Sequence, residues 1–149
     1  MRLACYQPEI AGNMGAMLRL AACYDVAVDV IEPCGFIWSD ARMRRAGMDY
    51  AAQVPVERHV DWTAFRKARP TRLILLTTKA EQRLHDFRFA QGDTILVGSE
   101  SSGVPADVAQ SCDALIKIRI SQAARSFNLA VAAAIALTEA LRQTGELPA

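Results

Sequence analysis

Three separated segments of this chain combine glycine, proline, asparagine and serine with side chains that could bind an anion or position a substrate. They span residues 8–15, 96–105 and 116–129. Arg19 follows the first segment, Glu100 lies in the second, and Asn128 stands near the end of the third. Each segment alone could be only a turn, because Gly and Pro punctuate loops in every fold and Asn and Ser cap helices. Their order and content together indicate a functional site.

The glycine-rich segments do not match the common nucleotide-binding or hydrolase motifs. No GxGxxG follows the first apolar run. Gly98 and Gly103 have the spacing of a phosphate-binding P-loop, but Val104 and Pro105 stand where Lys and Ser or Thr are needed. The chain has no GxSxG elbow, and neither histidine lies in a loop rich in Gly or Ser. A P-loop nucleotidase and a serine hydrolase are therefore excluded.

The elements that must position these segments alternate along the chain. Short β-rich runs and amphipathic segments follow one another, which is typical of an α/β fold with a mainly parallel sheet and helices on both faces. We expect strands at residues 3–6, 26–31, 73–77, 94–97 and 115–120, with a further short strand at 54–58. We expect helices at 15–24, from Pro105 to about 111, and at about 126–143. Asp40 and Asp61 are expected to cap two short helices that end near Gly47 and Pro70.

Length and composition indicate one globular domain over residues 1–149. Hydrophobic residues make up 52% of the 149 residues and charged residues 22%, which is typical of a folded chain with a substantial core. The longest apolar run, at 129–137, is far shorter than the roughly 20 residues of a membrane-spanning helix. A strand starts at residue 3 with no basic leader before it. We therefore expect a cytoplasmic protein that does not enter a membrane.

The cysteines do not form a metal-binding pattern. They stand at positions 5, 23, 34 and 112 without a CxxC pair, and the chain has two histidines. We expect no metal and no disulfide, with Cys5, Cys23 and Cys112 as small buried side chains. Cys34 is assigned no role.

The net charge of +1 argues against broad affinity for RNA, because such binding depends on neutralising several phosphates at once. Any basic patch must be local. Fourteen of the 17 cationic residues are arginine, which suits bidentate recognition of phosphate, although codon bias in a GC-rich genome explains the excess equally well.

The three segments resemble the motifs of the SPOUT superfamily of methyltransferases over nearly the full chain. An Asn-x-Gly loop that opens a helix, with an arginine one turn on, is matched by Asn13, Gly15 and Arg19. An apolar strand that leads into Gly-x-Glu-x-x-Gly-x-Pro is matched at residues 98–105, and a strand ending in Ile before a Ser-x-Asn-Leu helix start is matched at 120 and 126–129. The resemblance implies a deep C-terminal trefoil knot, a feature that pattern reasoning would not suggest because true knots are essentially absent among folds.

Residues 31–36, 44–50 and 76–79 resemble the small single-domain branch of this superfamily, which carries no separate RNA-binding domain. The resemblance implies 2′-O-methylation, dependent on S-adenosyl-L-methionine, of the ribose at wobble nucleotide 34, C or modified U, of tRNA. A related knotted enzyme acting on rRNA or on another tRNA position is the alternative, as is an RNA-binding homologue without catalysis. The departures from the family pattern, at Met14, Ala16, Ser121, Gln122 and Phe127, bear more on nucleotide preference than on fold or cofactor.

The resemblance also implies a set of cofactor-binding residues at the carboxyl ends of parallel strands, where ligands of open α/β sheets bind. Core packing competes with cofactor contact for the two apolar side chains of the set, and the glycine would let backbone approach the cofactor closely. The residues are Leu76, Gly98, Ile120 and Ser126.

The catalytic residues implied by the resemblance are Arg19, Asn13, Glu100 and Asn128. A guanidinium keeps its proton above pH ~12, so our hypothesis is that Arg19 binds the adjacent phosphate and stabilises developing alkoxide charge while the proton leaves to phosphate or water. Glu100 could brace Arg19 or the third segment, or form a structural ion pair. Asn128 could position the substrate, cap the last helix, or do both.

Substrate RNA is expected to meet local arginines, of which Arg125 is favoured because it precedes the Ser-x-Asn loop. The remaining residues in this set are Arg119, Arg44 and Arg45. The partners implied are the anticodon stem-loop of tRNA and a second copy of the chain. A stripe of small residues on the last helix, at 129, 132, 133, 136, 137 and 140, could receive a helix of that copy or could be buried in the core.

Overall fold

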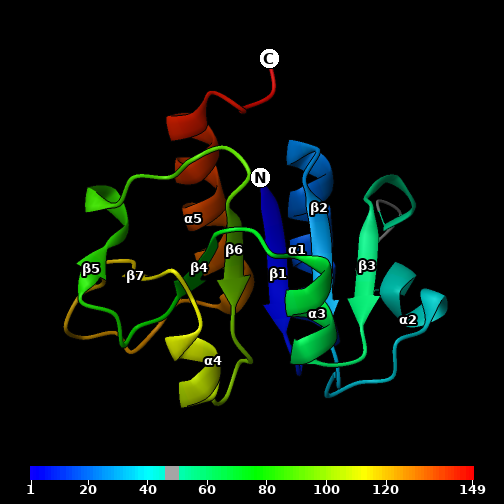
Figure 1. Cartoon of the computed structure of the whole chain (residues 1–149). Coiled ribbons are helices and arrows are strands. Elements are labelled where there is room, and N and C mark those ends of the chain that lie inside the picture. The colour runs from blue at the N-terminus through cyan, green and yellow to red at the C-terminus, as the bar shows by residue number, and fades with distance from the viewer. Residues whose placement is uncertain (46–50) are drawn as a thin grey trace.

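The computed structural model describes residues 1–45 and 51–149 (Figure 1). Its centre is a seven-stranded sheet of order β3-β2-β1-β6-β4-β7-β5, in which neighbouring strands of the described residues run parallel. The strands are β1 (Arg2–Tyr6), β2 (Ala27–Ile31), β3 (Val56–His59), β4 (Leu73–Leu76), β5 (Gln82–Arg83), β6 (Thr94–Val97) and β7 (Ala114–Lys117). The expected parallel α/β sheet is confirmed.

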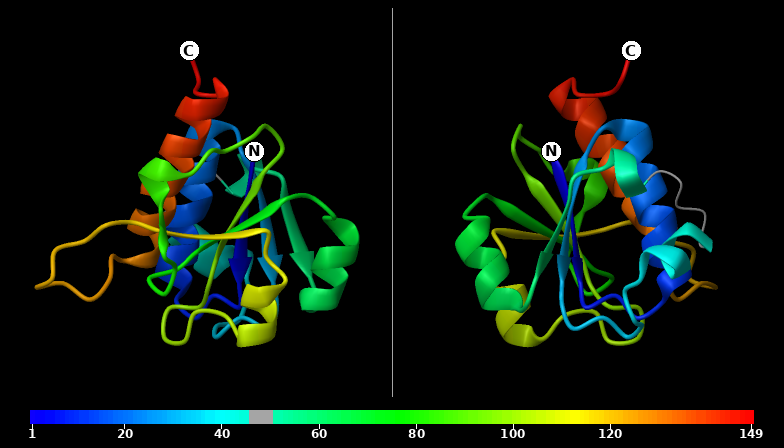
Figure 2. Two further views of the ribbon diagram at one scale, coloured as in Figure 1. Left: turned by 60° about the vertical axis from the view of Figure 1, so that its left-hand side comes forward. Right: turned by 90° about the vertical axis from the view of Figure 1, so that its right-hand side faces the viewer.

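The two faces of the sheet are covered by different helices (Figure 2). One face carries α1 (Ala11–Tyr24) and α5 (Leu129–Thr144), which share a core cluster with Leu3, Ile95 and Ile116. The other face packs against Phe65 of α3 (Trp62–Ala68) and Val108 of α4 (Ala106–Gln110). The chain also forms α2 (Asp40–Arg45) and the 3-10 turns η1 (Ala51–Gln53) and η2 (Leu84–Asp86). Helices on both faces are thus confirmed.

The central strands are apolar on both sides, as helices on two faces require. All four residues of β6 and the first three of β4 are buried. The Thr94 hydroxyl lies 3.0 Å from that of Thr71, so the one polar side chain of β6 has a partner. Such unbroken apolar runs are typical of buried parallel strands, and they explain why these strands were predicted from the sequence.

Several boundaries differ from the sequence expectation. Helix α1 begins at Ala11, before Gly15, and α5 begins at Leu129 because Asn128 caps it. Strand β7 ends at Lys117 instead of residue 120. Asp61 caps α3 as expected, accepting a 2.7 Å bond from the backbone N–H of Ala64.

The expected cap of α2 is wrong. Asp40 is the first residue of that helix, and the Ser39 hydroxyl accepts a 3.2 Å bond from the backbone N–H of Arg42. The expected helix end near Gly47 and the motif residues 46–50 lie outside the described residues.

The connection from β4 to β6, residues 77–93, encloses the C-terminal part of the chain. It reaches past β7 to form β5, which pairs with the far edge of β7 (Figure 1). On its way back it meets α5, where the Gln143 side chain donates to the Phe87 carbonyl (3.1 Å) and accepts from the Phe89 N–H (3.0 Å). The chain from β7 to α5 therefore threads this connection, as the trefoil knot of the SPOUT fold requires.

The small-residue stripe of α5 belongs to the core. Ala133, Ala136, Leu137 and Ala140 are fully buried against α1 and the sheet. Of the two alternatives for this stripe, core burial is confirmed, because α1 already occupies the close approach that small residues allow.

Candidate active site

Three loops leave the carboxyl ends of parallel strands at one edge of the sheet. Residues 7–10 follow β1, residues 98–105 follow β6, and residues 118–128 follow β7. These are the loops that carry the three sequence motifs. Parallel pairing brings their starting points to the same edge, where open α/β sheets bind ligands.

Glu100 holds the first loop and the start of α1. Its carboxylate accepts bonds from the backbone N–H groups of Glu9 (2.7 Å) and Ile10 (3.2 Å) and from the side-chain amide of Asn13 (3.2 Å). Ile10, the N-cap of α1, offers no capping side chain, so this carboxylate supplies an acceptor from a loop 90 residues away. Glu100 therefore braces the first loop directly, and its bond with Asn13 links it to the third loop through Asn128.

Asn13 and Asn128 join the first and third loops. The Asn128 amide nitrogen donates to the Asn13 side-chain oxygen at 2.9 Å. The Asn128 oxygen accepts from the backbone N–H groups of Ala130 (2.9 Å) and Val131 (3.3 Å). The capping role of Asn128 is thereby confirmed, and its side chain also contacts Asn13. Glu100, Asn13 and Asn128 form one connected group.

The described bonds argue against a general base in this group. Each carboxylate oxygen of Glu100 already accepts at least one N–H, and the Asn128 oxygen accepts two. An amide has no proton-accepting nitrogen at neutral pH. The arrangement therefore positions loops.

Arg19 lies further along α1. It is six residues beyond Asn13, about 9 Å along the helix axis at 1.5 Å per residue. Its side chain is on the exposed side of α1, which also carries Gly12, Ala16 and Cys23. The guanidinium is thus in reach of a ligand that covers this side of the helix.

The glycines of the second loop are explained by the loop itself. A Cβ on Gly98 would lie 2.6 Å from the backbone of Gly103, and Gly103 has φ +66°. Ser99 and Gly103 exchange two backbone bonds of 2.9 Å that close the turn. Gly98 thus permits a tight turn, and the close approach of cofactor at this glycine stays a prediction.

The other cofactor-binding residues of the prediction lie at the end of β4 and in the connection after β7. Leu76 is the last residue of β4 and pairs in register with Val97, next to Gly98. It is half-buried and packs against the core. Ile120 is half-buried and Ser126 exposed, both in the connection from β7 to α5. The four residues therefore come from three neighbouring strands and the segments that follow them.

The arginines predicted to bind RNA fall into two groups. Arg119 and Arg125 are exposed in the connection after β7. Arg45 is exposed in α2, which lies beyond the other end of the sheet, near β2 and β3 (Figure 1). The side chain of Arg44 lies outside the described residues. Among the described side chains of one chain, Arg45 therefore lies apart from Arg119 and Arg125.

Three of the four cysteines, Cys5, Cys34 and Cys112, are poor nucleophiles because burial raises their pKa values, and the expected burial needs one correction. Burial raises the pKa of the Cys5 thiol well above its usual range and raises the pKa values of Cys34 and Cys112 to about 11. Cys5 is fully buried and Cys112 half-buried. Cys23 is exposed, so its expected burial is wrong, because the helical period places it with Arg19 on the outer side of α1.

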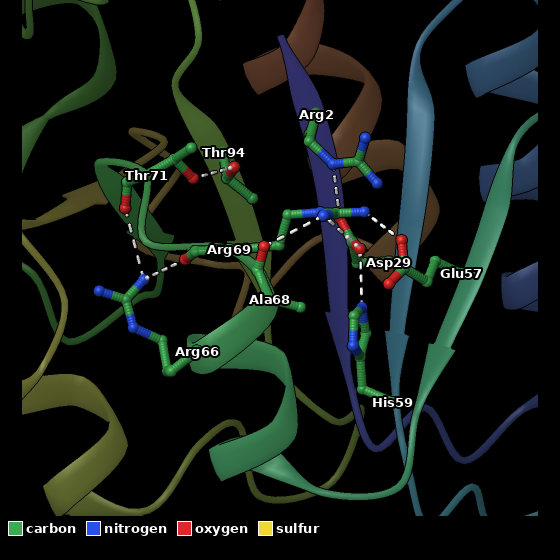
Figure 3. A network of polar contacts seen from close by, with 9 residues as sticks. All are labelled: Arg2, Asp29, Glu57, His59, Arg66, Ala68, Arg69, Thr71 and Thr94. Atoms are coloured by element: carbon green, nitrogen blue, oxygen red, sulfur yellow. Dashed lines mark hydrogen bonds and ion pairs between the residues drawn. The ribbon is translucent and has the colours of Figure 1, made fainter.

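A buried polar network that sequence reasoning missed lies on the α3 side of the sheet, opposite α1 and α5 (Figure 3). Asp29, fully buried in β2, accepts from Arg2 Nε (2.7 Å), contacts His59 Nε2 (2.8 Å) and pairs with Arg69 Nε (3.3 Å). Arg69 also pairs with Glu57. An Asp inside the apolar run of β2 is the sequence signal that could have revealed it, since a buried carboxylate needs partners.

This network includes the one group of three possible metal ligands found among residues 1–45 and 51–149, formed by Asp29, Glu57 and His59. Two guanidinium groups already contact these carboxylates, which is the composition of a structural ion-pair network rather than of a cation site. This network joins the end of α3 to β1, β2 and β3.

No helix in the described part of the chain is long and apolar enough to cross a membrane.

A parallel α/β sheet with a threaded C-terminus and three polar loops at one edge defines a knotted protein of the SPOUT class. The sequence matches the SpoU rRNA Methylase family over residues 1–138, and the chain belongs to this family. The resemblance seen in the sequence is confirmed.

Individual relatives cover nearly the whole chain. It is 53% identical to a tRNA (cytidine(34)-2′-O)-methyltransferase of Beijerinckia indica subsp. indica, over 97% of this chain and 92% of that protein. It is 40% identical to the enzyme of the same name from Escherichia coli K12, over 97% and 94%.

Solved structures agree with the sequence comparison. A structure concerned with the 2-OH methylation of C/U34 on tRNA matches with a TM-score of 0.90, 38% identity and coverage of 95% and 94%. The SpoU methyltransferase AviRb of Streptomyces viridochromogenes, in complex with the cofactor AdoMet, matches with a TM-score of 0.81 and 25% identity, over 96% of this chain and 57% of that one.

Proposed function

We propose that this protein is an RNA methyltransferase that transfers a methyl group from S-adenosyl-L-methionine to the ribose 2′-hydroxyl of nucleotide 34 of tRNA. The observation that carries the proposal is 53% identity over 97% of the chain to a relative named for this reaction. The joining of all three motif loops through Glu100, Asn13 and Asn128 supports it. The enzyme works in the cytosol, where its tRNA is found.

The cofactor residues suit an adenosine with a sulfonium-bearing methionine arm. Leu76 is a half-buried apolar side chain that pairs in register with Val97, next to the tight turn at Gly98. The connection after β7 adds the half-buried Ile120 and the hydroxyl of the exposed Ser126. When bound, S-adenosyl-L-methionine supplies an electrophilic methyl group. The loops would hold the cofactor at the edge of the sheet, where backbone N–H and C=O groups can hydrogen-bond to the polar edge of its adenine.

The substrate hydroxyl must be aligned and must lose its proton as the new bond to carbon forms. Arg19 binds the neighbouring phosphate and stabilises charge on the 2′-oxygen. Asn13, Glu100 and Asn128 hold the loops around it. The proton leaves to phosphate or water, because the oxygens of these three side chains are engaged in holding the loops.

The RNA and a partner subunit complete the proposal. The protein works as a homodimer in which both subunits contact the same tRNA. Arg119 and Arg125 of one subunit bind its anticodon stem-loop, and Arg44 and Arg45 of the other subunit bind the same RNA. Two subunits would join arginines that one chain leaves apart. A groove of about 420 Å³ on the outer side of α5, lined by His85, Ala134, Ile135, Thr138 and Glu139, offers a surface for the second copy. Residues 1–149 work as one domain within that dimer.

The deciding experiment is a methyl-transfer assay followed by mapping of the product. Purified protein is incubated with S-adenosyl-L-methionine and either tRNA or ribosomal RNA, and the RNA is digested and analysed by mass spectrometry. We expect a 2′-O-methylated nucleotide at position 34 of tRNA. Methylation confined to ribosomal RNA, to another tRNA position or to a base would refute the proposed substrate, and RNA binding without transfer would refute catalysis.

A further inference from the structure

Two glutamates join the first and second loops, because the carboxylate of each accepts hydrogen bonds from the other loop. Glu100 accepts the backbone N–H groups of Glu9 and Ile10, and in return Glu9 accepts the backbone N–H of Ser101 (2.9 Å) and the Ser101 hydroxyl (2.6 Å). Each loop thus supplies a carboxylate to the backbone of the other. Glu100 is a motif residue of the family resemblance, whereas no role was assigned to Glu9.

The backbone of Glu9 is fixed from a third side. The Gly35 N–H donates to the Pro8 carbonyl at 2.9 Å, and a Cβ on Gly35 would lie 2.9 Å from Glu9 Cα. The segment after β2 therefore packs directly on the first loop. With its main chain held there, the half-buried Glu9 side chain has a defined direction toward Ser101.

Ser101 stands at the centre of the turn that carries Gly98. The turn is closed by the Ser99 and Gly103 backbone bonds and by a 2.9 Å contact between the Ser99 and Ser102 hydroxyls. These bonds fix the shape of the turn, but they do not tie it to another loop. The contacts of Glu9 with Ser101 and of Glu100 with the first loop provide that tie.

We propose that Glu9 is a positioning residue that orients the 99–103 turn for cofactor binding and, through Glu100, the Asn13 side chain. This inference rests on the proposed function for its consequence in binding, while the orientation of the turn is a property of the protein alone. Bonds to a charged acceptor are stronger than neutral ones, so two of them on one serine set its place firmly.

The first test is hydrogen exchange of the cofactor-free protein. Glu9→Ala should speed amide exchange at residues 99–103 at least several-fold. The matched control is Glu146→Ala, which also removes a carboxylate with two partners, the Met1 amine (3.2 Å) and the Thr144 hydroxyl (2.6 Å), but at a site outside the three loops. Unchanged exchange at 99–103 in Glu9→Ala, or equal acceleration in Glu146→Ala, would overturn the proposal.

The second test is the affinity for S-adenosyl-L-homocysteine, measured by calorimetry for the wild type, Glu9→Ala, Glu9→Gln, Ser101→Ala and the double variant. We expect Glu9→Ala to weaken binding roughly 5- to 10-fold, as loss of charge-assisted bonds at a partly exposed site implies. Glu9→Gln should recover part of the loss because its amide oxygen still accepts. The double variant should bind no worse than Glu9→Ala, since the hydroxyl bond that Ser101→Ala removes is already lost in Glu9→Ala.

The outcomes separate this inference from the proposed function. Wild-type affinity in Glu9→Ala, or additive losses in the double variant, would refute the positioning role while the methyl transfer stands. A wild-type protein that binds the cofactor product without methylating tRNA would refute the proposed function and leave the role of Glu9 intact.

Discussion

At the scale of single residues, Asn128 does two tasks with one amide. Its oxygen caps α5 and its nitrogen donates to Asn13. The two tasks use different atoms, so a substitution can remove one and keep the other.

Asn128→Asp should keep stability and lose activity. Asp is as good an N-cap as Asn and complements the helix dipole, but it has no N–H for Asn13. We expect a Tm close to wild type and methyl transfer at least 10-fold slower, whereas Asn128→Ala should also lower the free energy of unfolding by about 1 kcal/mol. Thermal unfolding and single-turnover rates measure both effects. Wild-type rates in Asn128→Asp would leave capping as the residue's sole role.

Arg19→Lys should lose most turnover while cofactor affinity is unchanged. Lys keeps the positive charge, but it lacks the planar fork that binds a phosphate through two bonds. Single-turnover methylation and calorimetry with S-adenosyl-L-homocysteine separate the two effects. A near-normal rate in this variant would contradict the proposed role of the guanidinium.

At the scale of elements, helices α1 and α5 both end at a residue with left-handed backbone, but that residue is Asp in α1 and Gly in α5. Gly145 after α5 and Asp25 after α1 both adopt left-handed backbone, with φ 72° and φ 53°, and in both cases a following N–H reaches back to the helix. Only Gly adopts this conformation without strain. Asp25 also places a negatively charged residue at the C-terminal, negative end of the helix dipole.

We therefore expect opposite effects on stability from two substitutions. Asp25→Gly should raise the free energy of unfolding by about 1 kcal/mol, and Gly145→Ala should lower it by about 1 kcal/mol, because a Cβ is unfavourable in left-handed backbone. Urea unfolding at pH 7 measures both. A loss of stability in Asp25→Gly would show that the Asp side chain contributes more than its backbone strain costs.

Glu139 makes α5 sensitive to acid. The bonds from Arg142 (2.8 and 2.9 Å) and Gln143 (2.8 Å) lower the pKa of the Glu139 carboxyl from 4.5 to about 2. Since the pKa is lower in the folded chain, this contribution to stability is fully present above pH 4.5 and is lost as the pH falls toward 2. The wild type should therefore be more stable than Glu139→Gln at pH 6, and the difference should shrink at pH 4 and further at pH 3. A constant difference in urea unfolding would contradict the lowered pKa.

At the scale of the whole molecule, a net charge of +1 leaves RNA binding to local arginines. Arg125→Ala should weaken tRNA binding, lower the slope of the logarithm of affinity against the logarithm of salt concentration by about one, and leave cofactor affinity unchanged. Filter binding across a salt series measures this. An unchanged slope would remove Arg125 from the RNA surface.

Sequence patterns predicted the strands well and the helix starts less well. Buried parallel strands are short runs of mostly apolar residues, so the local sequence pattern is enough to predict β1, β4 and β6. Helix α1 starts before Gly15 because its first turn is held by Glu100, a residue of another loop that no local pattern includes. The sequence predicts a start of α5 at about Ser126, because Ser and Asn are both good caps, whereas in the structure Asn128 is the N-cap.

The sequence by itself determined the parallel α/β class, the three loops and, through resemblance, the methyltransferase family and its knot. Only the tertiary structure decided how the loops meet: the crossed Glu9 and Glu100, the Asn13 and Asn128 pair, the burial of the α5 stripe and the Asp29 network. Strand and helix patterns arise from neighbours along the chain, and sequence records them directly. Contacts between residues about 90 apart depend on how strands are ordered in the sheet, and that order is set by packing of the whole core.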